Sequence, residues 1–515
     1  MYTTIYSGAL FGVSAYLVSV EVDIDRGLPT FSMVGSLGSE VRESRERVMV
    51  ALKNAGIEMP PERITVNLSP GDRRKEGTAF DLPIAVGILE SMGYVQHKGT
   101  DNILFLGELG LNGELKKAKG VLPIVREAAE CGIVQCIVPR VNAREGAVIP
   151  GITVRGADNI GEVLCFLLEE DEERREKLLP TVKVDAGALF TQQEQQRYPD
   201  FSQVSGQEGA KRAAEIAAAG FHNLLMIGPP GAGKSMIAKR IPGILPPLSL
   251  AESLEVTSVV SVAGLMEEEG SLVTQRPFQS PHHSITQAAL IGGTSVPKPG
   301  IISLAHRGVL FLDELPEFQR SVLDSLRQPI EEKRVTLSRA GGNVTYPSDV
   351  MMVCAMNPCP CGFYPNKNRC ICTDTRVRQY MGKVSGPILD RIDLCVELHP
   401  VDVFSLQNEK KSEGSADIRK RVLRARERQT DRFRGTGYRF NGDIEAAVID
   451  KYCSLGRSEK KTMKQLYQSL QLSARAYHRI LKVARTIADL EGAEQIEEAH
   501  LLEAAFYRPT LDLQG

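Results

Sequence analysis

The chain has 515 residues, 42% of them apolar, so at roughly 150 residues per domain we expect two to four domains with ordinary buried cores. Its 62 Lys and Arg nearly balance its 64 Asp and Glu, and a net charge of -2 excludes a global attraction to nucleic acid or anionic membrane. Any polyanion site must therefore be local. No stretch reaches the roughly 18 apolar residues of a spanning helix, and no basic export signal opens the chain. We expect no membrane partner and a cytoplasmic location, which the ten dilute cysteines also favour.

Residues 1–168 mix strand-like and helix-like patterns. Short apolar runs predict strands at 15–22 and 64–68, while apolar residues at a spacing of three to four predict a helix at 45–54. We therefore predict an α+β N-terminal domain. The charged and polar stretch 169–199 that follows is typical of a solvated linker.

Residues 200–400 alternate between apolar strands and helical stretches separated by glycine-rich turns. The predicted strands lie at 223–227, 309–312 and 350–355. This alternation predicts an α/β domain around a parallel sheet. Residues 401–515 show helical patterns, which predict an all-helical C-terminal domain.

A GxxxxGK[ST] motif directly follows the predicted strand at 223–227 and precedes a helical stretch. Its glycines allow backbone N–H groups to turn toward phosphates, while Lys234 reaches the β- and γ-phosphate oxygens and Ser235 binds Mg²⁺. A chance glycine-rich turn is the alternative, but the strand–loop–helix context argues against it. The predicted ATP-binding residues are Gly228, Pro229, Pro230, Gly231, Ala232, Gly233, Lys234 and Ser235.

Two acidic residues follow the predicted strand at 309–312. Asp313 is predicted to complete the Mg²⁺ site, and Glu314 to orient and deprotonate the attacking water. Alone, such a pair is equally typical of a helix cap. Together with the phosphate-binding loop it favours ATP hydrolysis.

This combination of motifs resembles the AAA+ ATPases. The resemblance implies that Asn357, after the strand at 350–355, contacts the γ-phosphate and the attacking water as a first sensor. It also implies that Arg391 is an arginine finger for the neighbouring subunit's nucleotide and that Arg475 is a second sensor. A guanidinium fork suits phosphoryl charge, whereas the alternative for each arginine is a surface ion pair. Arg479 competes with Arg475 for the sensor role.

Four longer strings resemble the ComM/YifB family of magnesium-chelatase-like AAA+ ATPases, and the resemblance covers essentially the whole chain. The strings are RPFQSPHHS at 276–284, IISLAHRGVLFLDELPEF at 301–318, AMNPCPCG at 355–362 and SGPILDRID at 385–393. The resemblance implies a homo-hexameric ring that hydrolyses ATP to drive branch migration of recombination intermediates during natural transformation. The implied partner is branched or single-stranded DNA, and the implied activity is that of a branch-migration helicase.

Comparison with magnesium chelatase and the replicative MCM helicases implies an insert between residues 248 and 280 and a hairpin at 333–347 whose turn is 340–343. Alternating residues around a glycine turn support the hairpin independently. A solvated edge strand blunted by charge is the alternative to a DNA-binding hairpin. The candidate contacts with DNA phosphates are Lys333, Arg334 and Arg339.

The N-terminal domain resembles the Lon-protease-like fold. A working site of that kind needs a nucleophilic Ser and a Lys that deprotonates it. The matching positions hold Ala79 and, near the second, Ile124. We therefore predict a domain without the catalytic dyad, and a role in DNA binding or assembly instead of proteolysis. The helical C-terminal part is the corresponding lid domain.

A cysteine cluster follows Asn357 closely. Four soft ligands spaced C-x-C-x₈-C-x-C suit a tetrahedral Zn²⁺ site on an irregular loop, and four free thiols are the alternative because C-x-C is tighter than the usual C-x₂-C. The four are Cys359, Cys361, Cys370 and Cys372. His282 and His283 have no such ligand spacing, so we expect a structural or polar-network role for them.

Three functional hypotheses follow from these motifs. The first is the ATP-driven DNA motor. The second keeps the ATPase but makes it a chelatase- or chaperone-type remodeller of a protein complex. The third is a nucleotide-gated scaffold with negligible hydrolysis, and the hydrolytic set of Glu314, Asn357 and Arg391 argues against it.

Overall fold

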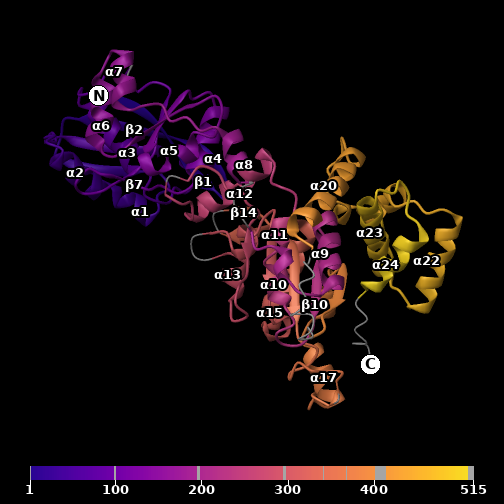
Figure 1. The fold of residues 1–515 in the computed structure, drawn as a ribbon. Helices are drawn as coiled ribbons and strands as arrows, with labels where there is room; N and C mark the ends of the chain where they lie inside the picture. Colours follow the sequence, from indigo (N-terminus) through magenta and orange to yellow (C-terminus); the bar gives the residue numbers. More distant parts are fainter. Residues whose placement is uncertain are drawn as a thin grey trace.

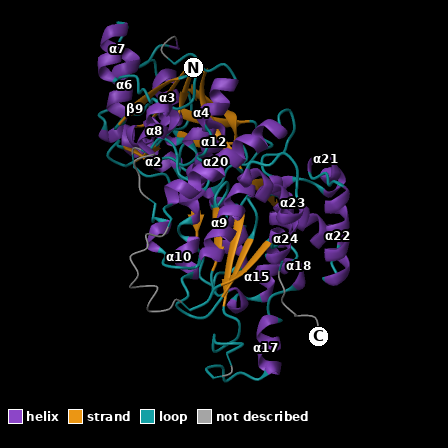
Figure 2. Cartoon of the chain, turned by 45° about the vertical axis from the view of Figure 1, so that its right-hand side comes forward, coloured by secondary structure: helices purple, strands orange, loops and turns teal. Residues whose placement is uncertain are grey.

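The computed structural model describes residues 2–97, 100–193, 198–268, 270–293, 297–339, 342–366, 368–400 and 413–508. Along the chain, an N-terminal lobe on a seven-stranded sheet is followed by a core on a five-stranded sheet and then by a group of helices (Figure 1). The core sheet lies in the middle of the molecule, and helix α17 projects beyond its end (Figure 2). No described helix is long and apolar enough to cross a membrane.

The sheet of the N-terminal lobe has the strand order β3-β4-β2-β1-β5-β8-β9. Burial alternates along β2, because successive side chains of a strand point to opposite faces. Helix α3 packs on this sheet and is buried over its full length. The strands are β1 (Tyr2–Phe11), β2 (Ser14–Asp25), β3 (Thr30–Val34), β4 (Arg63–Ser69), β5 (Ile103–Phe105), β8 (Gln135–Pro139) and β9 (Thr153–Ala157), with a small ladder of β6 (Glu108–Leu109) and β7 (Leu115–Lys116) beside them.

The helices of the lobe extend into the predicted linker. They are α1 (Ser39–Arg42), α2 (Ser44–Asn54), α3 (Asp81–Ser91), α4 (Val121–Glu130), α5 (Arg140–Gly146), α6 (Ile160–Leu168), α7 (Glu172–Leu178) and α8 (Ala186–Gln193). The guanidinium of Arg155 pairs with Glu176 of α7 at 2.7 Å, and Leu179 is fully buried in the core of the lobe. The first part of the stretch 169–199 therefore packs on the lobe.

The core sheet has the order β11-β12-β15-β10-β16, and every neighbouring pair in it is parallel. All residues of β10, β12 and β15 are buried, as continuous apolar strands covered on both faces require. The strands are β11 (Phe278–Gln279), β12 (Val309–Leu312), β15 (Met351–Met356), β10 (Leu224–Ile227) and β16 (Leu394–Glu397). The predicted α/β core around a parallel sheet is thus confirmed.

Helices surround this sheet, and a separate hairpin is built from β13 (Arg334–Arg339) and β14 (Gly342–Pro347). Arg339 pairs in register with Gly342, so Gly342 and Asn343 belong to the second strand; the other predicted turn residues, Ala340 and Gly341, lie outside the described residues. The helices are α9 (Glu208–Gly220), α10 (Lys234–Ala238), α11 (Ile241–Ile244), α12 (Leu250–Ala263), α13 (Gln287–Ile291), α14 (Ile301–Leu304), α15 (Arg320–Ser325), α16 (Arg327–Glu332), α17 (Asp374–Met381) and α18 (Gly386–Leu389), with single 3₁₀ turns at Phe201–Gln203 and Leu315–Glu317.

Helix α12 lies within the predicted insert and docks on the N-terminal lobe. A capping box formed by Ser249 and Glu252 starts this helix. Near its end, the Ser261 hydroxyl donates to the buried carboxylate of Glu145, and the Ser261 carbonyl accepts a hydrogen bond from the backbone of Gly120 at 3.1 Å. The lobe is therefore joined to the core by buried polar contacts.

The helices after residue 413 share a hydrophobic core with the parallel sheet. Ile418 of α20 and Ile487 of α23 belong to the same buried cluster as Ala214 of α9 and Met226 of β10. The predicted boundary at residue 400 thus does not separate two hydrophobic cores. The helices are α20 (Ser415–Arg432), α21 (Ile449–Tyr452), α22 (Arg457–Ser469), α23 (Ala474–Glu491) and α24 (Glu498–Phe506), with 3₁₀ turns at Asn441–Asp443 and Ala446–Val448.

Ion pairs join α12, the core and the C-terminal part around Glu255. Its carboxylate lies 3.2 Å from His306 Nε2, 2.9 Å from the Arg307 guanidinium and 3.6 Å from that of Arg439. Burial alone would raise the pKa of Glu255, but the hydrogen bond from His306 and the charge of Arg307 outweigh burial and lower the pKa to about 2.

We expect Glu255→Gln to lower the melting temperature at pH 7 and to matter less in acid. Because the folded pKa is lowered to about 2, the carboxylate stabilises the fold fully above its unfolded pKa of about 4.3 and loses that contribution as the pH falls toward 2. Thermal unfolding of both proteins between pH 7 and pH 3 checks this. The difference in melting temperature between wild type and Glu255→Gln should become smaller below pH 4. The control Glu268→Gln, at an exposed position, should melt at the wild-type temperature at every pH. A difference that widens in acid would contradict the assignment.

Candidate nucleotide-binding site

The loops after β10, β12 and β15 meet at one edge of the core sheet. These strands are parallel neighbours, so their carboxyl ends face the same side, where ligands of open α/β sheets bind. A cavity of about 350 Å³ opens there. It is lined by Pro230, Gly231, Ala232, Gly233, Lys234, Ser235, Met236, Asp313, Glu314, Met356 and Asn357.

The predicted phosphate-binding loop takes a conformation that needs glycine. Gly231 and Gly233 have φ angles of +79° and +92°, a region that side-chain-bearing residues rarely adopt. Helix α10 starts at Lys234 directly after the loop, so its free N–H groups point to the cavity. Backbone donors and the helix end together favour an anion at this place.

Lys234 is held in the cavity by three acceptors. Its Nζ donates to the carbonyl oxygens of Gly228 at 2.6 Å and Pro229 at 3.0 Å, and to Asn357 Oδ1 at 3.0 Å. Burial lowers its pKa, while the charges of Asp313 and Glu314 act in the opposite direction. A cation with partial desolvation and few counter-charges is suited to binding phosphate oxygens.

Ser235 and Asp313 present adjacent oxygen atoms. The Ser235 hydroxyl donates to Asp313 Oδ2 at 2.8 Å, and the other carboxylate oxygen accepts from the backbone N–H of Glu314 at 3.0 Å. A hydroxyl and a carboxylate beside a phosphate site match the oxygen ligands that Mg²⁺ prefers. These two residues would therefore hold a Mg²⁺ ion beside bound phosphates.

Glu314 has a contact that the sequence analysis missed. Its backbone has a φ of +52°, and its carboxylate lies 3.3 Å from His283 Nδ1. His283 follows β11, which is the neighbour of β12 in the sheet, and its ring lies edge-on to Phe318. The only hint of this contact in the sequence is that His282 and His283 closely follow the short stretch Phe278–Gln279. Nothing in the sequence shows that this stretch forms a strand beside β12.

The three candidate arginines lie outside the cavity lining. Arg391 donates to the Pro387 carbonyl at 2.7 Å and pairs with Glu331 at 2.6 Å. Arg475 is mostly exposed and lies 3.9 Å from Asp390. Its competitor Arg479 is more buried and donates to the Leu389 carbonyl at 3.3 Å. Within one chain, none of these guanidinium groups lines the described cavity, so any role on the nucleotide needs a neighbouring subunit or a movement.

Comparisons with known proteins agree with these observations. Family profiles match residues 20–142 (subunit ChlI of Mg-chelatase), 200–406 (magnesium chelatase, subunit ChlI) and 412–508 (its C-terminal part). The YifB protein of Salmonella typhimurium is 43% identical over 507 residues, which cover 98% of this chain and 96% of that protein. The competence protein ComM of Haemophilus influenzae is 41% identical over 512 residues, which cover 99% and 98%.

The chain belongs to the ComM/YifB family. Membership predicted from the four sequence strings is thereby confirmed. The family is of the magnesium-chelatase-like AAA+ type, which suggests ATPase activity and implies ATP and Mg²⁺ as cofactors. The residues around the cavity have the chemistry that both cofactors require.

The hairpin residues of this ComM/YifB protein are not equally available to a ligand. Lys333 pairs with Asp443 of the C-terminal part and with Asp349 at 3.3 Å, and these charges outweigh burial and raise the pKa of its ammonium. Arg334 is mostly exposed and lies 3.4 Å from Glu332. The Arg339 side chain lies outside the described residues. Lys333 thus anchors the base of the hairpin, and Arg334 is the more accessible cation.

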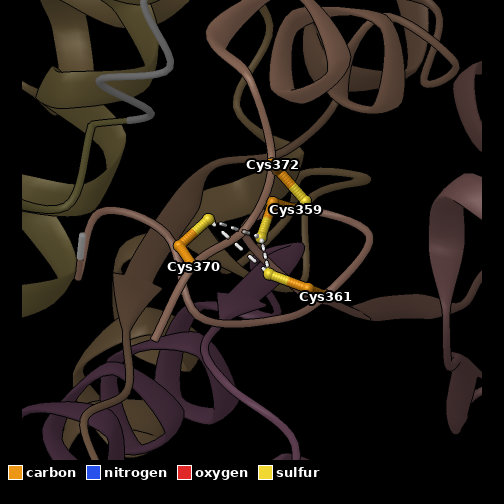
Figure 3. Close-up of side chains that lie close together, drawn as sticks. All are labelled: Cys359, Cys361, Cys370 and Cys372. Atoms are coloured by element: carbon orange, nitrogen blue, oxygen red, sulfur yellow. Dashed lines mark hydrogen bonds between the residues drawn. The ribbon is translucent and has the colours of Figure 1, made fainter. Parts of the chain in front are cut away.

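The four cysteines of the 359–372 segment gather at one point (Figure 3). Their sulfur atoms all lie within 4.8 Å of one another. Donation from the backbone N–H of Phe363 and from neighbouring thiols outweighs burial and lowers the pKa of Cys361 to about 6. For Cys370, in contrast, a backbone hydrogen bond from Cys372 lowers the pKa, but burial and hydrogen bonds with neighbouring thiols outweigh it and raise the pKa to about 12. Four sulfur ligands gathered at one point suit a soft metal ion.

We expect Lys234→Ala to weaken ATP binding by about tenfold or more, because it removes the charge aimed at the phosphates. Fluorescence titration with mant-ATP measures this. Lys239→Ala, at an exposed position at the end of the same helix, is the control and should bind normally. Equal affinities of the two variants would refute a phosphate-binding role for Lys234.

Proposed function

We propose that this ComM/YifB protein is an ATP-driven motor that acts on DNA as a homo-hexamer and promotes branch migration in natural transformation. The observation that carries the proposal is the convergence of Lys234, Asp313 and Glu314 on one cavity in a chain 41% identical to the competence protein ComM. The name of that relative links it to competence, from which we infer work on incoming DNA, and the hydrolytic residues of this chain would supply the energy.

The cavity residues suggest how ATP is hydrolysed. Lys234 binds the β- and γ-phosphate oxygens together with the N–H groups of the loop. Ser235 and Asp313 would hold Mg²⁺, which supplies charge neutralisation on the phosphates. Glu314 accepts a proton from the attacking water at a carboxylate oxygen, and Asn357 orients that water and the γ-phosphate.

We assign the remaining charge stabilisation to arginines. Arg391 reaches the nucleotide of the adjacent subunit, where an arginine finger contributes about 10³- to 10⁵-fold in rate. Arg475, placed on α23 beside α18, senses the nucleotide when the helical part closes as a lid. The exposed Arg334 of each hairpin contacts DNA phosphates in the central pore, and Arg339 is a second candidate for that contact.

The other parts of the chain receive supporting roles. We infer that the N-terminal lobe has a Lon-protease-like fold without its Ser–Lys dyad, since Ala79 stands at the nucleophile position and the lysine position falls near Ile124. We assign the lobe a role in DNA binding or assembly. We also infer that the cysteine cluster binds one structural Zn²⁺, because four thiols meet on an irregular loop.

We expect Glu314→Gln to lower kcat for ATP by about 10²-fold or more while mant-ATP binding stays within about twofold, because only the general base is removed. Steady-state ATPase assays measure this. Glu317→Gln is the matched control, since Glu317 lies on the next turn and pairs with Lys383 at 3.2 Å instead of facing the cavity. If Glu314→Gln hydrolysed ATP as fast as wild type, Glu314 could not be the general base.

The same assay distinguishes the substrate. For a DNA motor, four-way-junction DNA should stimulate the wild-type ATPase at low salt, less at high salt, and not stimulate Glu314→Gln. Turnover indifferent to every DNA tested would favour the chelatase- or chaperone-type remodeller that the magnesium chelatase profiles suggest. Tight ATP binding without turnover would favour a nucleotide-gated scaffold.

A mixing experiment tests whether Arg391 acts across subunits. Arg391→Ala and Glu314→Gln proteins should each be inactive, but a mixture should regain part of the ATPase, because some interfaces then combine an intact Glu314 with an intact neighbouring Arg391. Lys383→Ala, which changes an exposed cation away from the cavity, should remain active alone. A mixture as inactive as its components would refute action in trans.

A further inference from the structure

We propose that the cysteine loop, residues 359–372, is a Zn²⁺-held wall of the nucleotide site, so that occupancy of the metal site sets the affinity for ATP. The inference rests on the proposed function in one respect only, namely that the cavity binds ATP. The metal would thus order the cysteine loop and, through it, also support the phosphate-binding loop.

Three of the six distances between the sulfur atoms are near those of a tetrahedral zinc site, and all four sulfurs lie within 4.8 Å of one another. Four Zn–S bonds of about 2.3 Å give tetrahedron edges of about 3.8 Å. The sulfur of Cys370 lies 3.8 Å from that of Cys359 and 3.6 Å from that of Cys361, and the Cys359–Cys361 pair is 3.3 Å apart. Small shifts therefore suffice to admit the ion.

Besides the packing of its cysteines on the hydrophobic core, where Cys359 is fully buried, the loop has no regular secondary structure among its described residues, 359–366 and 368–372, to hold its shape. Hydrogen bonds within this described part of the loop are short-range, such as Gly362 N–H to the Cys359 carbonyl at 2.9 Å and Cys370 N–H to the Asn366 carbonyl at 2.8 Å. The Cys359 sulfur also accepts from the Tyr364 N–H at 3.4 Å, a contact typical of a metal-bound thiolate. A metal cross-link would fix this excursion as it does in small zinc domains.

A short stretch of sequence and one close contact connect the loop to the nucleotide cavity. Asn357, whose side chain accepts from Lys234 at 3.0 Å, is separated from the ligand Cys359 by one residue. Gly362 lies directly against the phosphate-binding loop: a Cβ atom added there would come within 2.4 Å of Pro230 Cδ. Gly362 also has a φ of +84°, so both the backbone conformation and the space demand glycine.

These contacts make the metal and the nucleotide interdependent. The cysteine loop buttresses Pro230 from one side and holds Asn357 beside Lys234. Without the ion, the loop would sample other conformations, and both cavity residues would lose their support. Part of the binding free energy of ATP would then be used to order the loop, and the protein would bind ATP more weakly.

The experiment measures metal content and nucleotide affinity separately on the full-length protein. Purified wild type should contain about one Zn²⁺ per chain by plasma mass spectrometry. The double variant Cys370→Ser, Cys372→Ser should lose the metal and bind mant-ATP about fivefold or more weakly. Cys165→Ser, which changes an exposed thiol in the N-terminal lobe, should retain both properties.

A second variant tests the contact between Gly362 and Pro230 without removing the metal ligands. It gives a result even if the cysteine variant does not fold. Gly362→Ala should keep Zn²⁺ yet weaken mant-ATP binding, because its methyl group displaces Pro230. Gly435→Ala is matched to it, with a φ of +76° but open space around the added methyl group, and should bind ATP normally.

The outcomes are distinct. Wild type without Zn²⁺, a metal-free variant with wild-type affinity, or a Gly362→Ala protein that binds ATP like Gly435→Ala would each overturn the proposal. A zinc-containing wild type that binds no nucleotide at all would instead overturn the proposed function.

Discussion

The parallel pairing of β10, β12 and β15 is the constraint on which the site depends. It brings the phosphate-binding loop, the acidic pair and Asn357 to one edge, although Lys234 and Asn357 are 123 positions apart. Because the three strands are fully buried, they cannot slip in register without exposing apolar side chains or burying polar ones. The fixed register of the strands therefore also fixes the relative positions of the residues that line the cavity.

Chemistry encoded in short strings could be predicted from sequence, and chemistry that depends on distant pairing could not. The strand at 309–312 and the loop ending in Lys234 lie where their local patterns place them. The contact of His283 with Glu314 depends on β11 lying beside β12, and local periodicity carries no information about sheet order. Likewise, the sequence does not show which lysines form salt bridges, so the salt bridge between Lys333 and Asp443 could not be predicted.

The base of the hairpin is a junction between all parts of the chain. A cavity of about 620 Å³ there is lined by Ser14 of the lobe, Lys333 at the hairpin and Asp443 of the C-terminal part. A Cβ atom added to Gly12, at the β1–β2 turn, would lie 3.0 Å from the Thr345 carbonyl of β14. Charged and closely packed contacts therefore link the C-terminal helices, the hairpin and the lobe at one place.

The lining of the described nucleotide cavity in one chain contains no guanidinium group. The cavity holds Lys234, Asp313 and Glu314, but Arg391 is turned to Glu331 and lies outside the described lining. Only 15% of the Arg391 side chain is exposed, against 64% for Glu331, and the guanidinium also donates to the Pro387 carbonyl at 2.7 Å. Moving Arg391 to a neighbour's phosphate would therefore break a backbone hydrogen bond as well as the ion pair. Phosphoryl charge attracts a guanidinium more strongly than a solvated carboxylate does, because it offers more negative charge in a site that excludes water. Under the proposed function, the nucleotide of an adjacent subunit would therefore have to supply the energy that draws Arg391 away from both Glu331 and the Pro387 carbonyl.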